Sequence, residues 1–192
     1  MENPKYVMQL VERGAITKSK KYGKLIKRST FVIVFLMILF SVLFGENLFM
    51  EMSFPTQLLL ASLVITSFSM NKLVSIYEPL ELYFYSDHLV IYRPKVTFNE
   101  KLSRREINKM MYSDITDIVF DEKNKRFKFY GDVYAEWFDY NADGTLPEVA
   151  QYNRLVKNAL QYFSVRGEEC VDPELTIQVI EANTPFKVKR ML

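Results

Sequence analysis

The stretch FVIVFLMILF, residues 31–40, contains only apolar side chains and decides how the N-terminal part of the chain folds. No residue from Ser29 to Gly45 is charged, so a helix built here has no polar face to turn towards water. A second uncharged stretch covers residues 52–71, and twenty helical residues span about 30 Å, the thickness of a bilayer core. We therefore predict two transmembrane spans, at about 29–50 and 53–74.

The charges beside these spans predict their topology. Residues 1–29 hold eight lysines and arginines against two glutamates, whereas the loop around Glu46 and Glu51 has neither lysine nor arginine. Because the cytoplasmic flanks of membrane helices are rich in lysine and arginine, we expect both termini in the cytoplasm. A cleaved signal peptide is the alternative for the first span, but a second apolar stretch follows it directly.

The basic N-terminal segment has two interpretations. In one, residues 5–28 form an amphipathic helix on anionic lipids, with about 1 kcal/mol from each basic side chain near the surface. In the other, the segment is only a topology signal. Both stay open, and we expect the lipid bilayer to be a partner of the chain.

After residue 77 apolar and polar residues alternate, which is typical of half-buried strands. Strands are predicted at 80–85, 88–92, 106–112, 115–120, 126–130 and 133–140, with a last strand at 175–181. Thr145 and Glu148 match a capping box, which predicts one amphipathic helix after residue 145. Its apolar stripe consists of Val149, Tyr152, Val156, Ala159 and Phe163.

The order of these elements resembles a known family. An aromatic hairpin directly follows the membrane hairpin, and the motif Y-S-D-I-x-x-I covers Tyr112 to Ile118. A tight hairpin at Phe120–Phe127 and one amphipathic helix come next. Over roughly Leu80–Phe163 the chain resembles the bacterial pleckstrin-homology-like domains of small two-span membrane proteins. The tail from Ser164 departs from that pattern, which usually ends at the helix.

This resemblance implies a protein of the bacterial inner (cytoplasmic) membrane. The predicted organisation is a basic segment (1–28), a transmembrane hairpin (29–77) and a cytoplasmic β-rich domain (78–192). The expected fold is therefore a two-helix hairpin followed by a mainly β domain, either pleckstrin-homology-like or a small β-barrel, with one amphipathic helix. Its expected function is to bind a protein, a lipid or a small anionic ligand.

The layout also resembles a second class, the two-transmembrane β-strand-rich effectors of cyclic-oligonucleotide antiphage systems. That resemblance implies an oligomeric, membrane-permeabilising pore former, activated by a nucleotide signal or a CRISPR-type partner. It rests on architecture, and architecture does not determine function. We keep it as the alternative function.

The residue types give little support to catalysis. His88 is the only histidine and Cys170 the only cysteine, and no phosphate-loop or dinucleotide signature occurs. Asp139, Asn141 and Asp143 are spaced like the start of a calcium loop, but the closing acidic ligand is missing and a turn is the better interpretation. We predict a non-enzymatic protein with no cofactor and no metal site.

Two basic clusters are the candidate ligand-binding residues. Their cations suit the phosphates of a headgroup or nucleotide, and nearby aromatic rings suit its bases. A solvated strand face with alternating charge is the simpler interpretation. The β-rich part is not basic overall, which argues against general nucleic-acid binding. The predicted residues are Arg104, Arg105, Lys109, Lys125, Arg126 and Lys128.

The membrane segment contains no charge in its apolar cores, which argues against a transporter. Ser62, Thr66 and Ser69 fall on one face of the second span, and small hydroxyl residues favour close helix packing. We therefore predict a homo-oligomer packed through this span, although packing within one hairpin explains the same residues.

Overall fold

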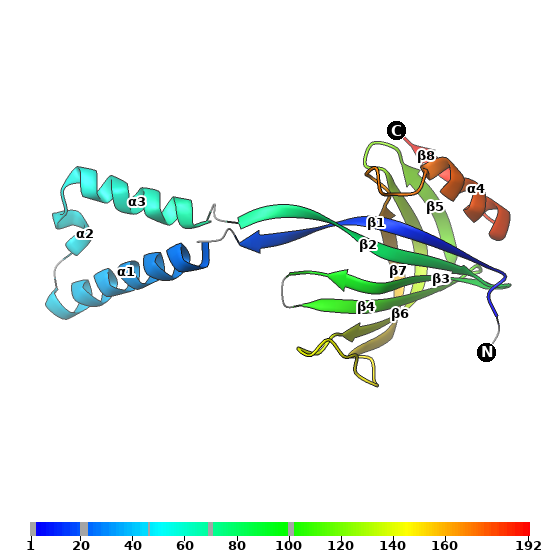
Figure 1. Ribbon diagram of the computed structural model, residues 1–192, viewed down its shortest axis with the longest axis horizontal. Helices are drawn as coiled ribbons and strands as arrows, with labels where there is room; N and C mark the ends of the chain where they lie inside the picture. Colours follow the sequence, from blue (N-terminus) through cyan, green and yellow to red (C-terminus); the bar gives the residue numbers. More distant parts are fainter. Residues whose placement is uncertain (1–2, 20–22, 46, 69–70, 100–101) are drawn as a thin grey trace. The chain divides into compact units, whose positions relative to one another are not determined.

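A computed structural model of the chain describes residues 3–19, 23–45, 47–68, 71–99 and 102–192. The chain forms two compact units (Figure 1). The helical unit covers Thr17–Val74, and the β unit combines the described residues up to Ile16 with those from Ser75 to Leu192. The N-terminal segment therefore contributes to the β unit instead of forming a separate element before the apolar helices.

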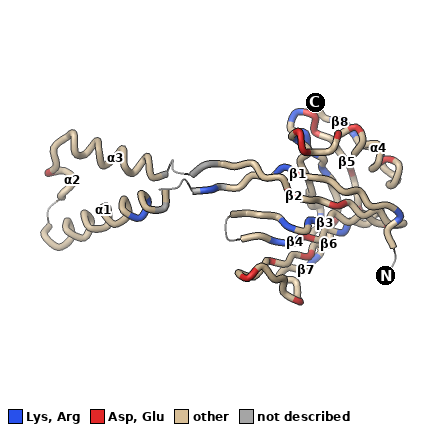
Figure 2. The backbone as a smooth tube through the Cα atoms, in the orientation of Figure 1, with Lys and Arg blue, Asp and Glu red and all other residues tan. Residues whose placement is uncertain are grey.

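The helical unit contains α1 (Gly23–Phe44), α2 (Leu48–Glu51) and α3 (Phe54–Phe68). Within the described residues, α1 is the single helix long and apolar enough to cross a membrane, and its length and composition fit a membrane span or a signal sequence. Figure 2 shows charge on these helices only near the start of α1 and on α2.

Helix α3 is shorter than the predicted second span. Its 15 residues reach about 22 Å, which is less than the roughly 30 Å of a bilayer core. From Asn71 onward the chain is already a strand, so the C-terminal end of the predicted span 53–74 is wrong. Composition alone hides this boundary, because the apolar residues continue into the strand.

The β unit is one strongly curled sheet that forms a half-barrel (Figure 1). Its strands follow the order β1-β2-β3-β4-β6-β5-β8, and β7 pairs with β6. The strands are β1 (Tyr6–Ser19), β2 (Asn71–Phe84), β3 (His88–Thr97), β4 (Ser103–Met111), β5 (Ile115–Asp121), β6 (Arg126–Asp139), β7 (Tyr152–Ser164) and β8 (Lys189–Met191).

Strand β6 organises this sheet, because β5 pairs with its first half, β4 with its second half and β7 with its other edge. Gly131 allows β6 to run on past the point where β4 ends and β5 begins. A Cβ atom there would lie 2.3 Å from the carbonyl oxygen of Asp114, so only glycine fits. The two strands predicted on either side of Gly131 are consequently one.

Alternate residues of the strands point into the half-barrel and form its core. Phe127, Phe129 and Phe163 are fully buried there, and the ring centroids of Phe127 and Phe163 lie 5.1 Å apart. Each such side chain contributes about 1.5–3 kcal/mol by leaving water. The period-two pattern thus predicted the strands of this core correctly from β2 to β6.

The amphipathic helix predicted after Thr145 is wrong, because this region is strand β7. Its inward residues include Tyr152, Val156, Ala159 and Phe163, at spacings of four, three and four. The spacing of three arises at Asn158, where a bulge with φ of 48° adds one residue to the strand. A period-two strand with one bulge therefore imitates the spacing of a helix.

Two further assignments were wrong in secondary structure. Residues 175–181, predicted as a strand, belong to helix α4 (Pro173–Asn183). Asp172 caps that helix and Pro173 begins it, which is a start signal that the alternating residues concealed. The N-terminal amphipathic helix is instead strand β1, whose alternate residues Leu10 and Ile16 are buried.

A buried arginine joins strands across the open side of the half-barrel. Arg93 of β3 is 6% exposed, and its Nε donates to Oε1 of Glu12 on β1 at 2.6 Å. Its Nη2 donates to the carbonyl oxygen of Tyr162 on β7 at 2.7 Å, and its Nη1 lies 3.6 Å from the carboxylate of Glu106 on β4. In the described chain β1 pairs only with β2, and β7 only with β6. Arg93 therefore connects two strand edges that no backbone ladder joins.

We predict that Arg93→Met destabilises the protein by about 3–5 kcal/mol, since it leaves two buried carboxylates without their cation. Trp137, the only tryptophan, packs against the core and reports unfolding by denaturant in detergent. Arg13→Met is the matched control, because Arg13 is exposed and its guanidinium donates to the exposed hydroxyl of Ser75; the substitution should cost about 0.5 kcal/mol or less. Equal effects of the two substitutions would contradict the role of Arg93.

The ion cluster formed by Arg93, Glu12 and Glu106 predicts that the stability of the protein depends on pH. Burial raises the pKa of Glu106 above its ordinary value of 4.5, although Arg93 and Arg104 act in the opposite direction. The folded state thus holds this proton more tightly than the unfolded chain, and the contribution of Glu106 to stability falls as pH rises above about 4.5.

Glu106→Gln should therefore stabilise the protein relative to wild type at pH 7.5 and have no such effect at pH 4. Urea midpoints across this range measure the difference, with Glu169→Gln on the exposed loop as the control. A difference that does not change with pH would show that the buried charge is not its cause.

Candidate functional site

Four of the six predicted ligand-binding cations lie on the outer face of the curled sheet. Side chains alternate along β4 and β6, and the inward residues Met110, Phe127 and Phe129 are buried. Their neighbours point outward instead. These outward cations are Arg105, Lys109, Arg126 and Lys128.

The outward cations are spread along the sheet. Arg105 lies opposite Phe138 and Lys109 opposite Tyr134, near the end of β6, whereas Arg126 begins this strand. Twelve residues of strand separate Arg126 from Phe138, roughly 40 Å at 3.3 Å per residue. Such a length exceeds a small ligand, so these residues do not form one small-molecule site.

Exposed apolar side chains lie among these cations. Tyr134 of β6 pairs with Leu155 of β7, and both are exposed, at 41% and 51%. Leu160 and Tyr162 continue along β7 with 45% and 50% exposure, and the guanidinium of Arg126 lies 5.2 Å from the ring of Tyr162. We define the outer face as Arg105, Lys109, Arg126, Tyr134, Leu155, Leu160 and Tyr162.

The apolar half of the outer face was missed in the sequence because β7 was assigned as a helix. Leu160 and Tyr162 alternate with the inward residues Gln161 and Phe163, which is the signal of a two-sided strand. Both faces of β7 contain apolar residues, but the helix prediction used only the inward ones, because their spacing matches a helix.

Lys128 has a structural role. Its Nζ lies 2.8 Å from Oδ2 of Asp121, which is 2% exposed. Hydrogen bonds from Asn124 and from Lys128 hold the pKa of Asp121 well below its ordinary value. The charge of Lys128 is therefore already neutralised by Asp121 beside the β5–β6 turn.

Arg104 points to the inner side, opposite to its neighbour Arg105. Its Nε donates to Oδ1 of Asp139 at 2.6 Å, and its guanidinium lies 4.6 Å from the ring of Trp137. Trp137 stacks on Tyr152 with 4.0 Å between ring centroids. Both faces of this indole are covered, so the stack leaves no free platform on Trp137 for a base.

Lys125 lies apart from the outer face. It occupies the turn between β5 and β6 with φ of 51°, and its Nζ lies 5.6 Å from the ring of Phe120. It also lines a cavity of about 420 Å³. The six predicted cations thus divide among the outer face, the inner stack, an internal ion pair and this cavity.

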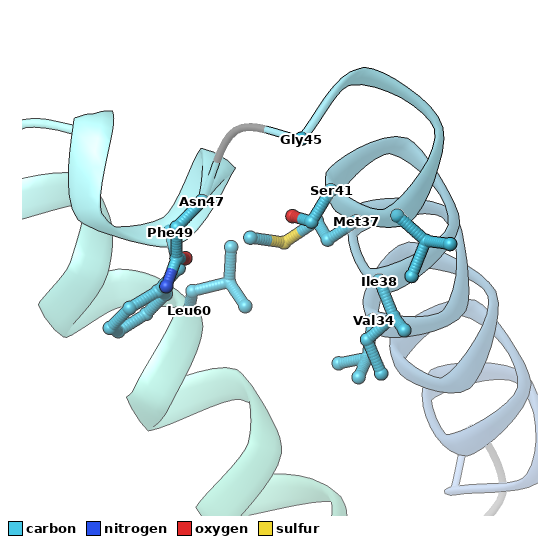
Figure 3. A pocket seen from close by; sticks show the side chains of 9 residues that line it. Val34, Met37, Ile38, Ser41, Gly45, Asn47, Phe49 and Leu60 are labelled. Carbon is cyan, nitrogen blue, oxygen red and sulfur yellow. The ribbon is translucent and has the colours of Figure 1, made fainter.

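The predicted packing residues lie in the helical unit. The hydroxyls of Ser62 and Thr66 donate to the carbonyls of Leu59 and Ser62 within α3, and Ser69 lies outside the described residues. An open apolar cavity of about 480 Å³ lies between α1, α2 and α3 (Figure 3). Val34, Met37 and Leu60 face it from opposite helices.

The groups with catalytic potential have local partners. His88 is buried; its Nδ1 lies 2.5 Å from Asp87, and its ring stacks on Tyr85. Burial raises the pKa of the Cys170 thiol, and the nearby glutamates act in the same direction. Among the described residues no group of three or more histidine, cysteine or acidic side chains is placed to hold a metal ion.

Comparison with protein-family models, with curated proteins and with solved structures returned no match. The site must therefore be judged on its own geometry.

The geometry predicts opposite outcomes for two neighbouring cations. Lys128→Ala should lower the unfolding midpoint, because it removes the cation that balances buried Asp121. Arg126→Ala should stay within about 0.5 kcal/mol of wild type, because the Arg126 side chain is exposed and lies over the ring of Tyr162 without an ion pair to any described residue. Denaturant unfolding of the two variants, monitored by Trp137 fluorescence, measures the difference. A larger loss of stability in Arg126→Ala than in Lys128→Ala would contradict the structural role that we assign to Lys128.

Proposed function

We propose that this chain is a non-enzymatic, membrane-anchored binding module whose outer face binds an acidic, extended segment of another protein. The observation that carries the proposal is the combination of unpaired cations with exposed tyrosines and leucines on one side of β6 and β7. Tyrosine and arginine are enriched among the residues that dominate protein interfaces.

Shape favours a protein chain over a lipid surface as the partner. The outer face is the convex side of a curled sheet (Figure 1), and a flat bilayer touches a convex surface along a narrow zone only. An extended peptide follows the curvature and reaches cations roughly 40 Å apart. Among the described residues, no carboxylate forms an ion pair with exposed Arg126 or with half-buried Arg105, so acidic side chains of such a segment would pair with them.

The anchor in this proposal is the helical unit. Most apolar side chains of α1 are exposed, among them Phe31, Phe35 and Val42, and α3 likewise exposes Leu58, Leu59 and Ile65. Side chains of this kind suit a lipid environment. We propose that α1 and the shorter α3 insert together as a hairpin in a bacterial inner membrane, with α3 reaching less deeply than α1 and both termini cytoplasmic. This arrangement agrees with the resemblance to pleckstrin-homology-like two-span proteins.

Charge reversal on the outer face tests the proposal. The triple variant Arg105→Glu, Lys109→Glu, Arg126→Glu, in nanodiscs, should bind fluorescent 15-residue peptides that combine glutamate with leucine and tyrosine at least tenfold more weakly than wild type. This loss corresponds to about 1.4 kcal/mol. A matched control reverses three exposed cations elsewhere, Lys5, Lys95 and Lys187, and should retain binding.

Fluorescence anisotropy at two salt concentrations measures both variants. Peptide binding that survives reversal of the outer face would refute the proposal. If charge reversal of the outer face weakens binding to anionic vesicles more than binding to acidic peptides, the partner is a lipid surface instead.

The pore-forming alternative stays a prediction from the sequence. A pore needs an assembly of several copies. The hydroxyls of Ser62 and Thr66, which were predicted to pack between copies, donate to carbonyls of their own helix. Native mass spectrometry of the full chain in mild detergent distinguishes the two functions, since a pore requires a defined assembly of four or more subunits.

A further inference from the structure

Tyr162 takes part in both sides of the curled sheet. Its ring is exposed and belongs to the outer face, while its carbonyl oxygen accepts a hydrogen bond from Arg93 in the ion cluster. We propose that Arg93 is a positioning residue for partner binding, which holds the ring of Tyr162 in place through the backbone, and that Glu106 regulates this contact. The inference rests on the proposed function, because it takes the outer face as the binding surface.

The carbonyl of Tyr162 faces the edge of β7 that no strand of the described chain pairs with. The N–H of Val165 donates to the carbonyl of Lys125 at 2.9 Å, so Val165 directs its backbone groups towards the turn before β6. Backbone groups alternate in direction along a strand, and the carbonyl of Tyr162, three residues earlier, therefore points the other way. In the described chain β7 pairs only with β6. The bond of 2.7 Å from Nη2 of Arg93 thus fixes this part of the edge.

The ring of Tyr162 depends on a fixed backbone, because its own contacts are few. The guanidinium of Arg126 lies 5.2 Å from the centre of this exposed ring. The next residue, Phe163, is fully buried and stacks on Phe127, so the core holds the strand from its inner side. Arg93 adds the contact at the edge. Side chains that dominate an interface bind best when they are already held in position before the partner arrives.

Glu106 competes for the same guanidinium. Its Oε2 lies 3.6 Å from Nη1 of Arg93, which is beyond hydrogen-bonding distance, whereas Oε1 of Glu12 lies 2.6 Å from Nε. A guanidinium is a rigid plane, so a movement of Nη1 towards Glu106 also displaces Nη2. An ionised Glu106 attracts the guanidinium more strongly than a protonated one. The hydrogen bond to the carbonyl of Tyr162 therefore weakens when Glu106 loses its proton.

The charged groups that act on Glu106 come from several strands. Arg93 of β3 and Arg104 of its own strand β4 favour the ionised form, and Glu12 of β1 opposes it. Arg104 is already paired with Asp139 of β6 at 2.6 Å. Burial outweighs the two arginines and raises the pKa of Glu106, so the protonated form persists above the ordinary value of 4.5. The ionised form gains as pH rises further, and the contact with β7 weakens in the same direction.

Hydrogen–deuterium exchange of the full chain in nanodiscs tests this contact without any partner. Glu106→Gln keeps the shape of the side chain and cannot ionise. At pH 7.5 residues 160–164 of this variant should exchange about threefold or more slowly than in wild type, and at pH 4 the two proteins should agree. Each comparison is made at one pH, so the direct effect of pH on exchange cancels. Glu169→Gln, on the exposed loop, should behave as wild type.

Peptide binding shows whether the ring transmits the effect. At pH 7.5 Glu106→Gln should bind the acidic fluorescent peptides about threefold more tightly than wild type. Both proteins are folded at this pH, so a change in stability alone would leave the affinity unchanged. Tyr162→Ala removes the ring and keeps the backbone carbonyl. In that background Glu106→Gln should have no effect on affinity, which completes a double-mutant cycle.

Unchanged exchange of residues 160–164 in Glu106→Gln at pH 7.5 would overturn the inference. An equal gain of affinity with and without the ring of Tyr162 would also overturn it. Absence of peptide binding to wild type would refute the proposed function, and with it the role of Arg93 in partner binding. Slower exchange of β7 in Glu106→Gln would in that case show that the contact exists and that the partner is wrong, so the two failures are distinguishable.

Discussion

The side chain of Arg93 is the contact on which the shape of the β unit depends. The edge strands β1 and β7 of the curled sheet are not joined to each other by a backbone ladder in the described chain, and a buried guanidinium reaches Glu12 on β1 and the backbone of Tyr162 on β7. The burial of this cation requires carboxylates beside it, since an isolated buried charge is very costly. Two carboxylates share it, which explains why burial prevails over attraction at Glu106 and raises its pKa. The sheet thus closes through side chains instead of through a ladder of backbone hydrogen bonds.

Much of the fold was predictable, because apolar and polar residues alternate over most of the length of the strands from β2 to β6, with bulges only in β3 and β5 among the described residues of these strands. The assignment failed where one residue changes the period. At Asn158 a bulge turns a spacing of two into three, and a helical pattern results. In α4, Thr176 and Ile180 lie on one helical face, but Leu175, Ile177 and Val179 alternate with polar residues as a strand would. Local periodicity was therefore reliable only where the element was regular.

The candidate site was less predictable than the fold, because charge alone does not distinguish the role of a cation. Arg104 and Arg105 are adjacent in sequence and yet lie on opposite sides of the sheet, one in a stack with Trp137 and the other on the outer face. Lys128 resembles Arg126 in composition and spacing, but its partner Asp121 becomes visible only through the register of β5 against β6. Lys125 and Arg166 are 41 positions apart in the sequence, yet both line the same cavity. These relations arise from strand pairing, which one sequence does not reveal.

The apolar helices interrupt the β unit in the sequence. They do not precede the β unit; they are inserted into it, between β1 and β2. The first strand supplies Met8 and Leu10 to the core and Glu12 to Arg93. A fragment beginning after the helices would lack these groups and would leave Arg93 with Glu106 as its one carboxylate. The strands that flank the helical unit in the sequence, β1 and β2, belong to the same sheet. The β unit therefore depends on residues from both sides of the helical unit in the sequence.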